Sequence, residues 1–205
     1  MQYFEGRSTM TGTPLIVGIG GTTRPNSSCE KLLRAALDMA ERRGARTILL
    51  GAADLAMPHY APERPERSAE SKRLAETVAQ ADAVLISSPG YHGSISGLLK
   101  NALDYIEDLR GDRRPYLDGR AVGLIVSAGG WQATATTLAA LRSIVHALRG
   151  WPTPLGVCVN TSEPFFGDDG PIIDGIQRQL DLLVDQMMQF TQAFASLPTD
   201  TRALA

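Results

Sequence analysis

The sequence predicts an α/β fold in which a parallel sheet carries helices on both faces. Short apolar runs alternate with longer helical patterns along the chain. The apolar runs are continuous in Val, Leu and Ile, as in residues 81–88 (ADAVLISS), which is typical of strands buried on both faces. A helix between successive strands gives right-handed crossovers, and therefore parallel strands.

The first half of the chain contains two predicted strands and two predicted helices. A strand over residues 14–20 (PLIVGIG) ends at a pair of glycines, and a helix follows over 27–43. This helix is predicted because its apolar residues share one face: Leu32, Leu33, Ala36, Leu37 and Ala40. Gly44 ends the helix, and a second strand covers residues 46–51. A proline-rich stretch then leads to a helix over residues 67–80.

The second half continues the alternation. Its strands are predicted at residues 81–88, 120–130 (with the exit loop of that strand) and 153–160. Its helices are predicted at residues 96–109, 131–148 and 171–195. The first of these helices has one apolar face, formed by Leu98, Leu99, Ala102, Leu103 and Ile106. Sheets of this kind bind ligands outside the carboxyl ends of their strands, so the loops after strands one, three and four are the candidate site.

Length and composition are those of one globular domain. The 205 residues are 43% hydrophobic and 20% charged. We expect a flexible lead-in at residues 1–12, a single domain at 13–197 and a tail at 198–205. The net charge of −2 offers no basic field for nucleic acid or anionic lipid, and no apolar run is long enough to span a bilayer. The first residues show no secretion signal.

Cysteine and histidine positions argue against disulfide and metal chemistry. Cys29 and Cys158 lie far apart and form no Cys-x-x-Cys pair, so we expect a reducing compartment and a cytoplasmic protein. The histidines, His59, His92 and His146, lack the spacing of metal ligands, and no metal site is predicted.

The loop after the first strand suits a phosphate monoester. GIGGTTRPNSSCEKLL (18–33) has the first two glycines of a dinucleotide fingerprint, but Thr23 occupies the third glycine position. What remains is a set of hydroxyl side chains and Arg24, leading into a helix N-terminus whose free N–H groups and dipole attract anions. The alternative is that Ser27 or Ser28 only caps the helix.

A second distinctive stretch follows the third strand. SSPGYHGSISGLLKNALDY (87–105) combines an aromatic ring, an imidazole and two glycines before a helix. Together with GIGGTTRPNSS, it resembles the NADPH-dependent FMN reductase family over about residues 13–160. The resemblance implies a flavodoxin-like three-layer sandwich with a five-stranded parallel sheet in the order 2-1-3-4-5. It also implies FMN as cofactor, NADPH or NADH as reductant, and a homodimer or homotetramer.

The resemblance implies three groups of cofactor-binding residues. The FMN phosphate would be held by Thr22, Arg24, Ser27, Ser28 and Cys29. The isoalloxazine ring would contact Pro89, Gly90, Tyr91, His92, Gly93 and Ser94. The pyrimidine side of the ring would contact Ser127, Gly129 and Gly130. Glycines let the backbone approach the ring closely. We predict no catalytic residue, because the cofactor performs the chemistry.

For some residues the sequence leaves two structural or functional roles open. Cys29 lies near a helix N-terminus, which can lower the pKa of a thiol, but a small loop or packing residue is the favoured interpretation. His92 either lines the ring edge or faces solvent, and Trp131 either covers the substrate face or packs at the start of its helix. Ser96 is expected to cap the helix after the motif. Gly90, where many relatives have a larger residue, predicts a looser contact with the ring.

The favoured function is an FMN-dependent NAD(P)H oxidoreductase that passes hydride through FMN to a flavin, a quinone or a similar small acceptor. One alternative is a flavin reductase that supplies reduced FMN to a partner monooxygenase. Ile95 argues against it, since such relatives can have Tyr there while quinone- and azo-reducing relatives often have Ile. An electron carrier without nicotinamide turnover would be more acidic than −2, and a non-catalytic member would not need the intact ring motif. The helix 96–109 is expected at a subunit interface, because Tyr105 and Leu109 extend its apolar surface.

Overall fold

The fold is built on a parallel β-sheet. The computed structural model describes residues 12–24, 26–166 and 172–197 of the chain. The strands of the sheet are β1 (Leu15–Gly20), β2 (Arg46–Leu50), β3 (Ala83–Pro89), β4 (Ala121–Ala128), β5 (Trp151–Pro152) and β6 (Val157–Asn160). The strand order is β2-β1-β3-β4-β5, with β6 also paired to β4, and all of these pairs are parallel. The predicted parallel sheet and its flavodoxin-like order are therefore confirmed.

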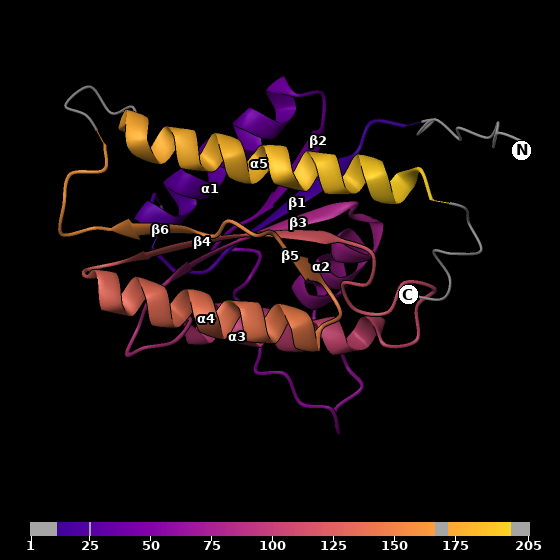
Figure 1. Ribbon diagram of the computed structural model, residues 1–205. Helices are drawn as coiled ribbons and strands as arrows, with labels where there is room; N and C mark the ends of the chain where they lie inside the picture. Colours follow the sequence, from indigo (N-terminus) through magenta and orange to yellow (C-terminus); the bar gives the residue numbers. More distant parts are fainter. Residues whose placement is uncertain (1–11, 25, 167–171, 198–205) are drawn as a thin grey trace, which may run out of the picture.

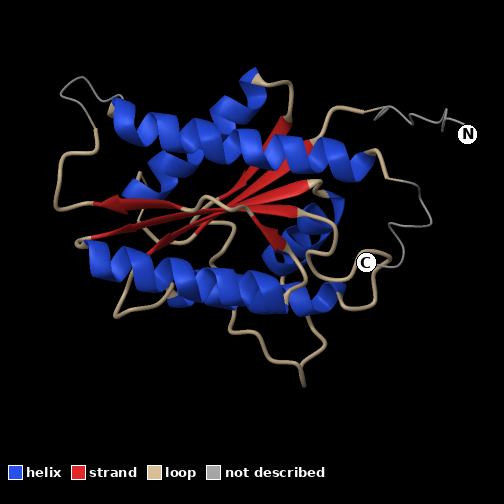
Figure 2. Cartoon of the chain, in the orientation of Figure 1, coloured by secondary structure: helices blue, strands red, loops and turns tan. Residues whose placement is uncertain are grey.

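Helical layers cover both faces of the sheet, as Figures 1 and 2 show. One layer consists of α1 (Ser28–Arg42) and α5 (Asp174–Ala195). The other consists of α2 (Ala69–Gln80), α3 (Gly97–Asp104) with a 3₁₀ turn at Tyr105–Leu109, and α4 (Trp131–Ala147). The predicted apolar face of α1 is buried against the sheet. β3 and β4 are buried along their whole length, as their continuous apolar sequences predict.

The predicted fifth strand, residues 153–160, is wrong in its bounds and its continuity. β5 pairs with the beginning of β4 and β6 with its end, and residues 153–156 separate them. Pro154 has no N–H for a ladder hydrogen bond, and the hydroxyl of Thr153 donates to the carbonyl oxygen of Leu155 (2.7 Å). The last helix begins at Asp174, whereas its predicted start, 171, lies outside the described residues. So do the predicted tail and all of the predicted lead-in except residue 12.

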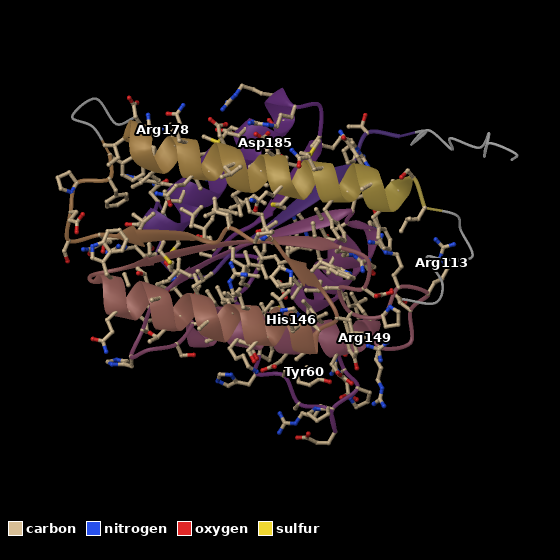
Figure 3. The ribbon with its side chains drawn as sticks, in the orientation of Figure 1. Tyr60, Arg113, His146, Arg149, Arg178 and Asp185 are labelled. Atoms are coloured by element: carbon tan, nitrogen blue, oxygen red, sulfur yellow. The ribbon has the colours of Figure 1, made fainter. Side chains whose placement is uncertain are left out.

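The loop between β2 and α2 covers the end of α3, which corrects the argument for a subunit interface there. Tyr105 and Leu109 are only 4% and 5% exposed, so they offer no apolar surface to a partner. The Tyr105 hydroxyl donates to the carbonyl oxygen of Pro58 (3.1 Å). The guanidinium of Arg67 lies over the Tyr105 ring, 5.6 Å from its centroid, and also over the ring of Tyr60, which Figure 3 labels. These contacts fold the loop onto the helix within one chain.

α5 is held against α1 by ion pairs. Arg43, which follows the last residue of α1, donates to carboxylates of Asp185 (2.7 Å) and Asp181 (3.0 Å) on α5. Figure 3 shows Asp185 on this outer layer. The ion pairs lie at the end of α1 that is remote from the carboxyl edge of the sheet. Neither α5 nor any other helix in the described part of the chain is long and apolar enough to cross a membrane.

Candidate functional site

A cleft of about 390 Å³ opens at the carboxyl edge of the sheet. In Figure 1 the strands end on the left of the view. The cleft lies where the chain order reverses between β1 and β3, the position at which open α/β sheets bind their ligands. Its volume is within the range of cofactor and small-molecule sites. The described residues that line it are Thr22, Thr23, Arg24, Ser27, Ser28, Cys29, Pro89, Gly90, Tyr91, Ser127, Ala128, Gly129 and Thr161.

The loop after β1 is shaped by hydrogen bonds of its own side chains. Ser27 is the N-cap of α1, and its hydroxyl accepts a hydrogen bond from the Glu30 N–H (3.3 Å). The Glu30 carboxylate in turn accepts from the Asn26 N–H (3.0 Å). The Thr22 hydroxyl accepts from the Arg24 N–H (3.0 Å), so the Thr22 side chain is part of the turn. The predicted capping role of Ser27 is confirmed, and its hydroxyl still has a proton to donate to a ligand.

Donors without partners gather at the start of α1. Among the described residues, no hydrogen-bond partner is found for the backbone N–H groups of Ser27, Ser28 and Cys29. Arg24 is exposed, and within the same part of the chain it pairs with no carboxylate. Free N–H groups, the positive end of the helix dipole and a guanidinium form an environment that attracts an anion.

Cys29 connects the loop after β1 to β3 and β4 through hydrogen bonds. Its Sγ lies 2.9 Å from the Ser127 hydroxyl, and the Ser87 hydroxyl donates to the Cys29 carbonyl oxygen (2.9 Å). Burial raises the pKa of the Cys29 thiol, and hydrogen bonds to Ser127 and Ser87 only partly offset this effect. The raised pKa argues against a reactive thiolate at Cys29 and agrees with the interpretation of a small loop or packing residue.

The stretch after β3 forms a tight turn at one wall of the cleft. Tyr91 and Ser94 exchange backbone hydrogen bonds of 2.9 and 3.0 Å across it. The two central residues have positive φ angles, 50° at His92 and 82° at Gly93, as a type I′ turn requires. A Cβ at Gly93 would have no neighbour within 4 Å. The turn conformation thus favours glycine at position 93.

Gly90 is required by packing against α4. Its N–H donates to the carbonyl oxygen of Ser127 (2.9 Å), which places the backbone between the cleft and the helix. A Cβ at this position would lie 2.9 Å from the hydroxyl oxygen of Thr137 and 3.0 Å from the Cβ of Ala128. The absent side chain therefore leaves room for α4, and this is the physical reason for glycine at this position. The predicted cap is also confirmed: the Ser96 hydroxyl accepts from the Leu99 N–H (3.2 Å) at the start of α3.

Most of the predicted site residues line this one cleft, but some lie beside it. The residues outside the described lining are His92, Gly93, Ser94 and Gly130. The first three belong to the turn, where His92 faces solvent, and Gly130 is the extended N-cap residue of α4. Thr23, one of the hydroxyl residues of the loop after β1, also lines the cleft, and Ala128 and Thr161 line it without having been predicted. Thr161 directly follows β6, so applying the carboxyl-edge rule to that strand would have found it.

A flavodoxin-like sheet with a cleft at its switch point, lined by hydroxyl side chains and an arginine, is typical of nucleotide- and flavin-binding proteins. Residues 14–163 of the chain match the model of the NADPH-dependent FMN reductase family. The chain belongs to this family. The motifs after β1 and β3 both lie within the matched residues.

Sequence relatives and structural neighbours agree with this assignment. The FMN-dependent NADPH-azoreductase of Staphylococcus haemolyticus (strain JCSC1435) is 36% identical over 132 residues, which are 63% of this chain and 66% of that protein. The alignment thus spans just under two thirds of the relative's length. The NAD(P)H:(acceptor) oxidoreductase FerB of Paracoccus denitrificans has a TM-score of 0.70 at 23% identity, over 87% of this chain and 99% of FerB. An NADH:FMN oxidoreductase in its apo form has a TM-score of 0.69 at 21% identity, covering 91% and 93%. At these identities the two structures show a shared fold.

Proposed function

We propose that this protein is an FMN-dependent NADPH oxidoreductase that holds the FMN phosphate at the start of α1. The observation that supports this proposal most directly is the set of unpaired N–H groups near Arg24, in the cleft at the switch point of the sheet. Membership of the NADPH-dependent FMN reductase family supports FMN and NADPH as the cofactor pair. The relatives named FMN-dependent NADPH-azoreductases support the same activity.

The donor set of the cleft fits FMN better than FAD. A phosphate monoester accepts several hydrogen bonds at one point. The residues that line the cleft at the start of α1 offer such donors: the N–H groups of Ser27, Ser28 and Cys29, the Ser28 hydroxyl and the Arg24 guanidinium. A pyrophosphate needs the longer glycine-rich turn that this loop lacks. FMN is therefore the expected cofactor, and FAD should bind more weakly.

The ring of the cofactor belongs between two walls. Pro89, Gly90 and Tyr91 after β3 form one wall, and Gly129 and Thr161 contribute to the other. When bound, FMN supplies a two-electron relay, by which NADPH and one proton are consumed and a quinone leaves with two electrons and two protons gained. Arg24 is the only charged side chain among the described residues that line the cleft, so these residues orient the reactants while solvent exchanges the protons.

Anaerobic addition of NADPH to the FMN-loaded protein tests this function. We expect bleaching of the oxidised flavin within seconds, followed by steady-state NADPH oxidation with a quinone or an azo dye as acceptor. An electron carrier or a non-catalytic flavin protein would bind FMN but show no bleaching by NADPH. Either of those results, or failure to bind FMN at all, would overturn the proposal.

Retention of FMN through turnover is the second part of the proposal. Ile95 is 8% exposed and packs in the core, and α3 begins regularly behind it with Ser96 as its N-cap. This favours a reductase of quinone- or azo-type acceptors over a supplier of reduced FMN to a monooxygenase. Stopped-flow mixing of the reduced holoprotein with an apo-flavoprotein trap tests it, since transfer as fast as NADPH turnover would indicate release in every cycle.

We also propose that the protein is a homodimer or homotetramer in the cytoplasm. The support for the assembly is the family resemblance, because Tyr105 and Leu109 are buried within one chain. Light scattering at micromolar concentration should show an assembly of two or four chains, and a fully active monomer would contradict it.

A further inference from the structure

Trp131 is an exposed aromatic residue at the edge of the cleft. It is the first residue of α4 and is 56% exposed, although tryptophan is on average a largely buried residue. Packing at the start of the helix does not explain an indole that leaves more than half of its surface in solvent. Its exposed surface is therefore available for contact with a ligand.

Hydrogen bonds fix the exposed indole in place. The Trp131 Nε1 donates to Oε1 of Glu163 (3.0 Å) in the loop after β6. The same oxygen accepts from Nδ2 of Asn160 (2.8 Å), and Oδ1 of Asn160 accepts from the Ser162 N–H (3.1 Å). A ring that is already oriented loses little further conformational freedom when a ligand stacks on it.

The fixed indole stands beside residues that line the cleft. Gly129, two residues before Trp131, lines the cleft, and so does Thr161, which lies between Asn160 and Glu163 in the chain. The Thr161 N–H donates to the carbonyl oxygen of Ala128 (2.8 Å), which connects the loop before Trp131 with the loop that contains Glu163. Tyr91, on the wall formed after β3, is 55% exposed. Exposed aromatic residues thus follow both β3 and β4, the two strands whose carboxyl ends contribute residues to the cleft.

We propose that Trp131 selects the electron acceptor by stacking on planar aromatic molecules, and that the Glu163 carboxylate disfavours anionic ones. This rests on the proposed function, in which the acceptor gains two electrons and two protons. One oxygen of Glu163 accepts both hydrogen bonds, from Trp131 and Asn160, and this carboxylate lies two residues after Thr161, which lines the cleft. Neutral quinones are therefore the preferred acceptor class, ahead of sulfonated quinones and sulfonated azo dyes.

Acceptor kinetics test the stacking role against a matched control. Trp131→Ala should lower kcat/KM for menadione about two- to tenfold, the range expected for losing an aromatic pair contact. Trp151→Ala is the control, because Trp151 is 53% exposed but lies on β5, which pairs with the opposite end of β4. Anaerobic reduction by NADPH should be normal in both variants. If the flavin is reduced normally but kcat/KM for menadione is equal in the two variants, the role of Trp131 is overturned and the proposed function stands. If NADPH does not reduce the flavin of the wild type, the proposed function is overturned.

Fluorescence gives a second readout that needs no turnover. In Trp151→Phe, Trp131 is the only tryptophan, since the sequence has two. Menadione added without NADPH should quench its emission with a saturating curve, and a linear, collisional response would contradict stacking. Glu163→Gln keeps an oxygen for the indole but removes the charge. The ratio of kcat/KM for menadione to kcat/KM for a sulfonated anthraquinone should fall about two- to fivefold in this variant, the scale of an exposed charge interaction. An unchanged ratio would overturn the role of Glu163.

Discussion

Replacing Arg24 by alanine should weaken FMN binding through the phosphate alone. Arg24 lines the cleft, is exposed and pairs with no carboxylate among the described residues, so its removal breaks no ion pair there. Stability should change by no more than about 0.5 kcal/mol, as for other surface substitutions. A hydrogen bond to a charged group contributes about 1.5–3 kcal/mol. Solvent screening at this exposed position favours the lower end, about 1.5 kcal/mol, which corresponds to a roughly tenfold higher Kd.

Titration of the apoprotein with FMN and with riboflavin isolates this contribution. Riboflavin has the same ring without the phosphate, so Arg24→Ala should raise the Kd for FMN about tenfold and leave that for riboflavin unchanged. Arg42→Ala is the charge-matched control, since Arg42 is exposed in the last turn of α1, at the end remote from the cleft. The FMN effect should shrink as salt is added, because screening weakens exposed charge interactions.

The result that would refute this reasoning is an equal loss of affinity for FMN and riboflavin. It would mean that Arg24 contacts the ring or supports the loop. An unchanged Kd for both ligands would place the phosphate away from Arg24 and the start of α1. Equal effects of Arg24→Ala and Arg42→Ala would show that net charge, and not position, controls binding.

Three further substitutions test the structural reasoning around the cleft and in the core. Gly90→Ala should destabilise the protein by about 1–3 kcal/mol in urea unfolding, because its Cβ would overlap the Thr137 hydroxyl oxygen at 2.9 Å; a neutral result would show that α4 yields easily. Arg120→Met should cost about 2–4 kcal/mol with FMN affinity unchanged, since this buried guanidinium, whose pKa burial lowers to about 10, donates to several backbone carbonyls. Cys29→Ser should lose less stability than the wild type between pH 8 and 10. Because the pKa of the Cys29 thiol is raised in the folded state, the thiol's contribution to the free energy of unfolding is complete below its usual pKa of 9.0 and is lost as the pH rises above it. Equal losses of stability in the variant and the wild type would contradict the raised pKa.

The sequence by itself determined the order of the elements and the place of the cleft. Hydrophobic periodicity is local, and it identified the apolar face of α1 and the fully buried strands β3 and β4. Capping is also local, since a hydroxyl bonds to an N–H three residues ahead, and Ser27 and Ser96 were both recognisable as caps. The carboxyl-edge rule then predicted the position of the cleft without any knowledge of side-chain contacts.

Tertiary structure decided each property that depends on residues distant in the chain. The pKa of the Cys29 thiol is raised because the surrounding core excludes water from it, and the hydrogen bond to Ser127, on β4, offsets this only in part. Tyr105 is buried because the loop before α2 folds over it, and Gly90 is glycine because α4 passes close by. The orientation of Trp131 depends on Glu163 in another loop. No local pattern encodes such contacts, because burial and hydrogen-bond partners across the fold exist only after the strands have paired and the helices have packed on them.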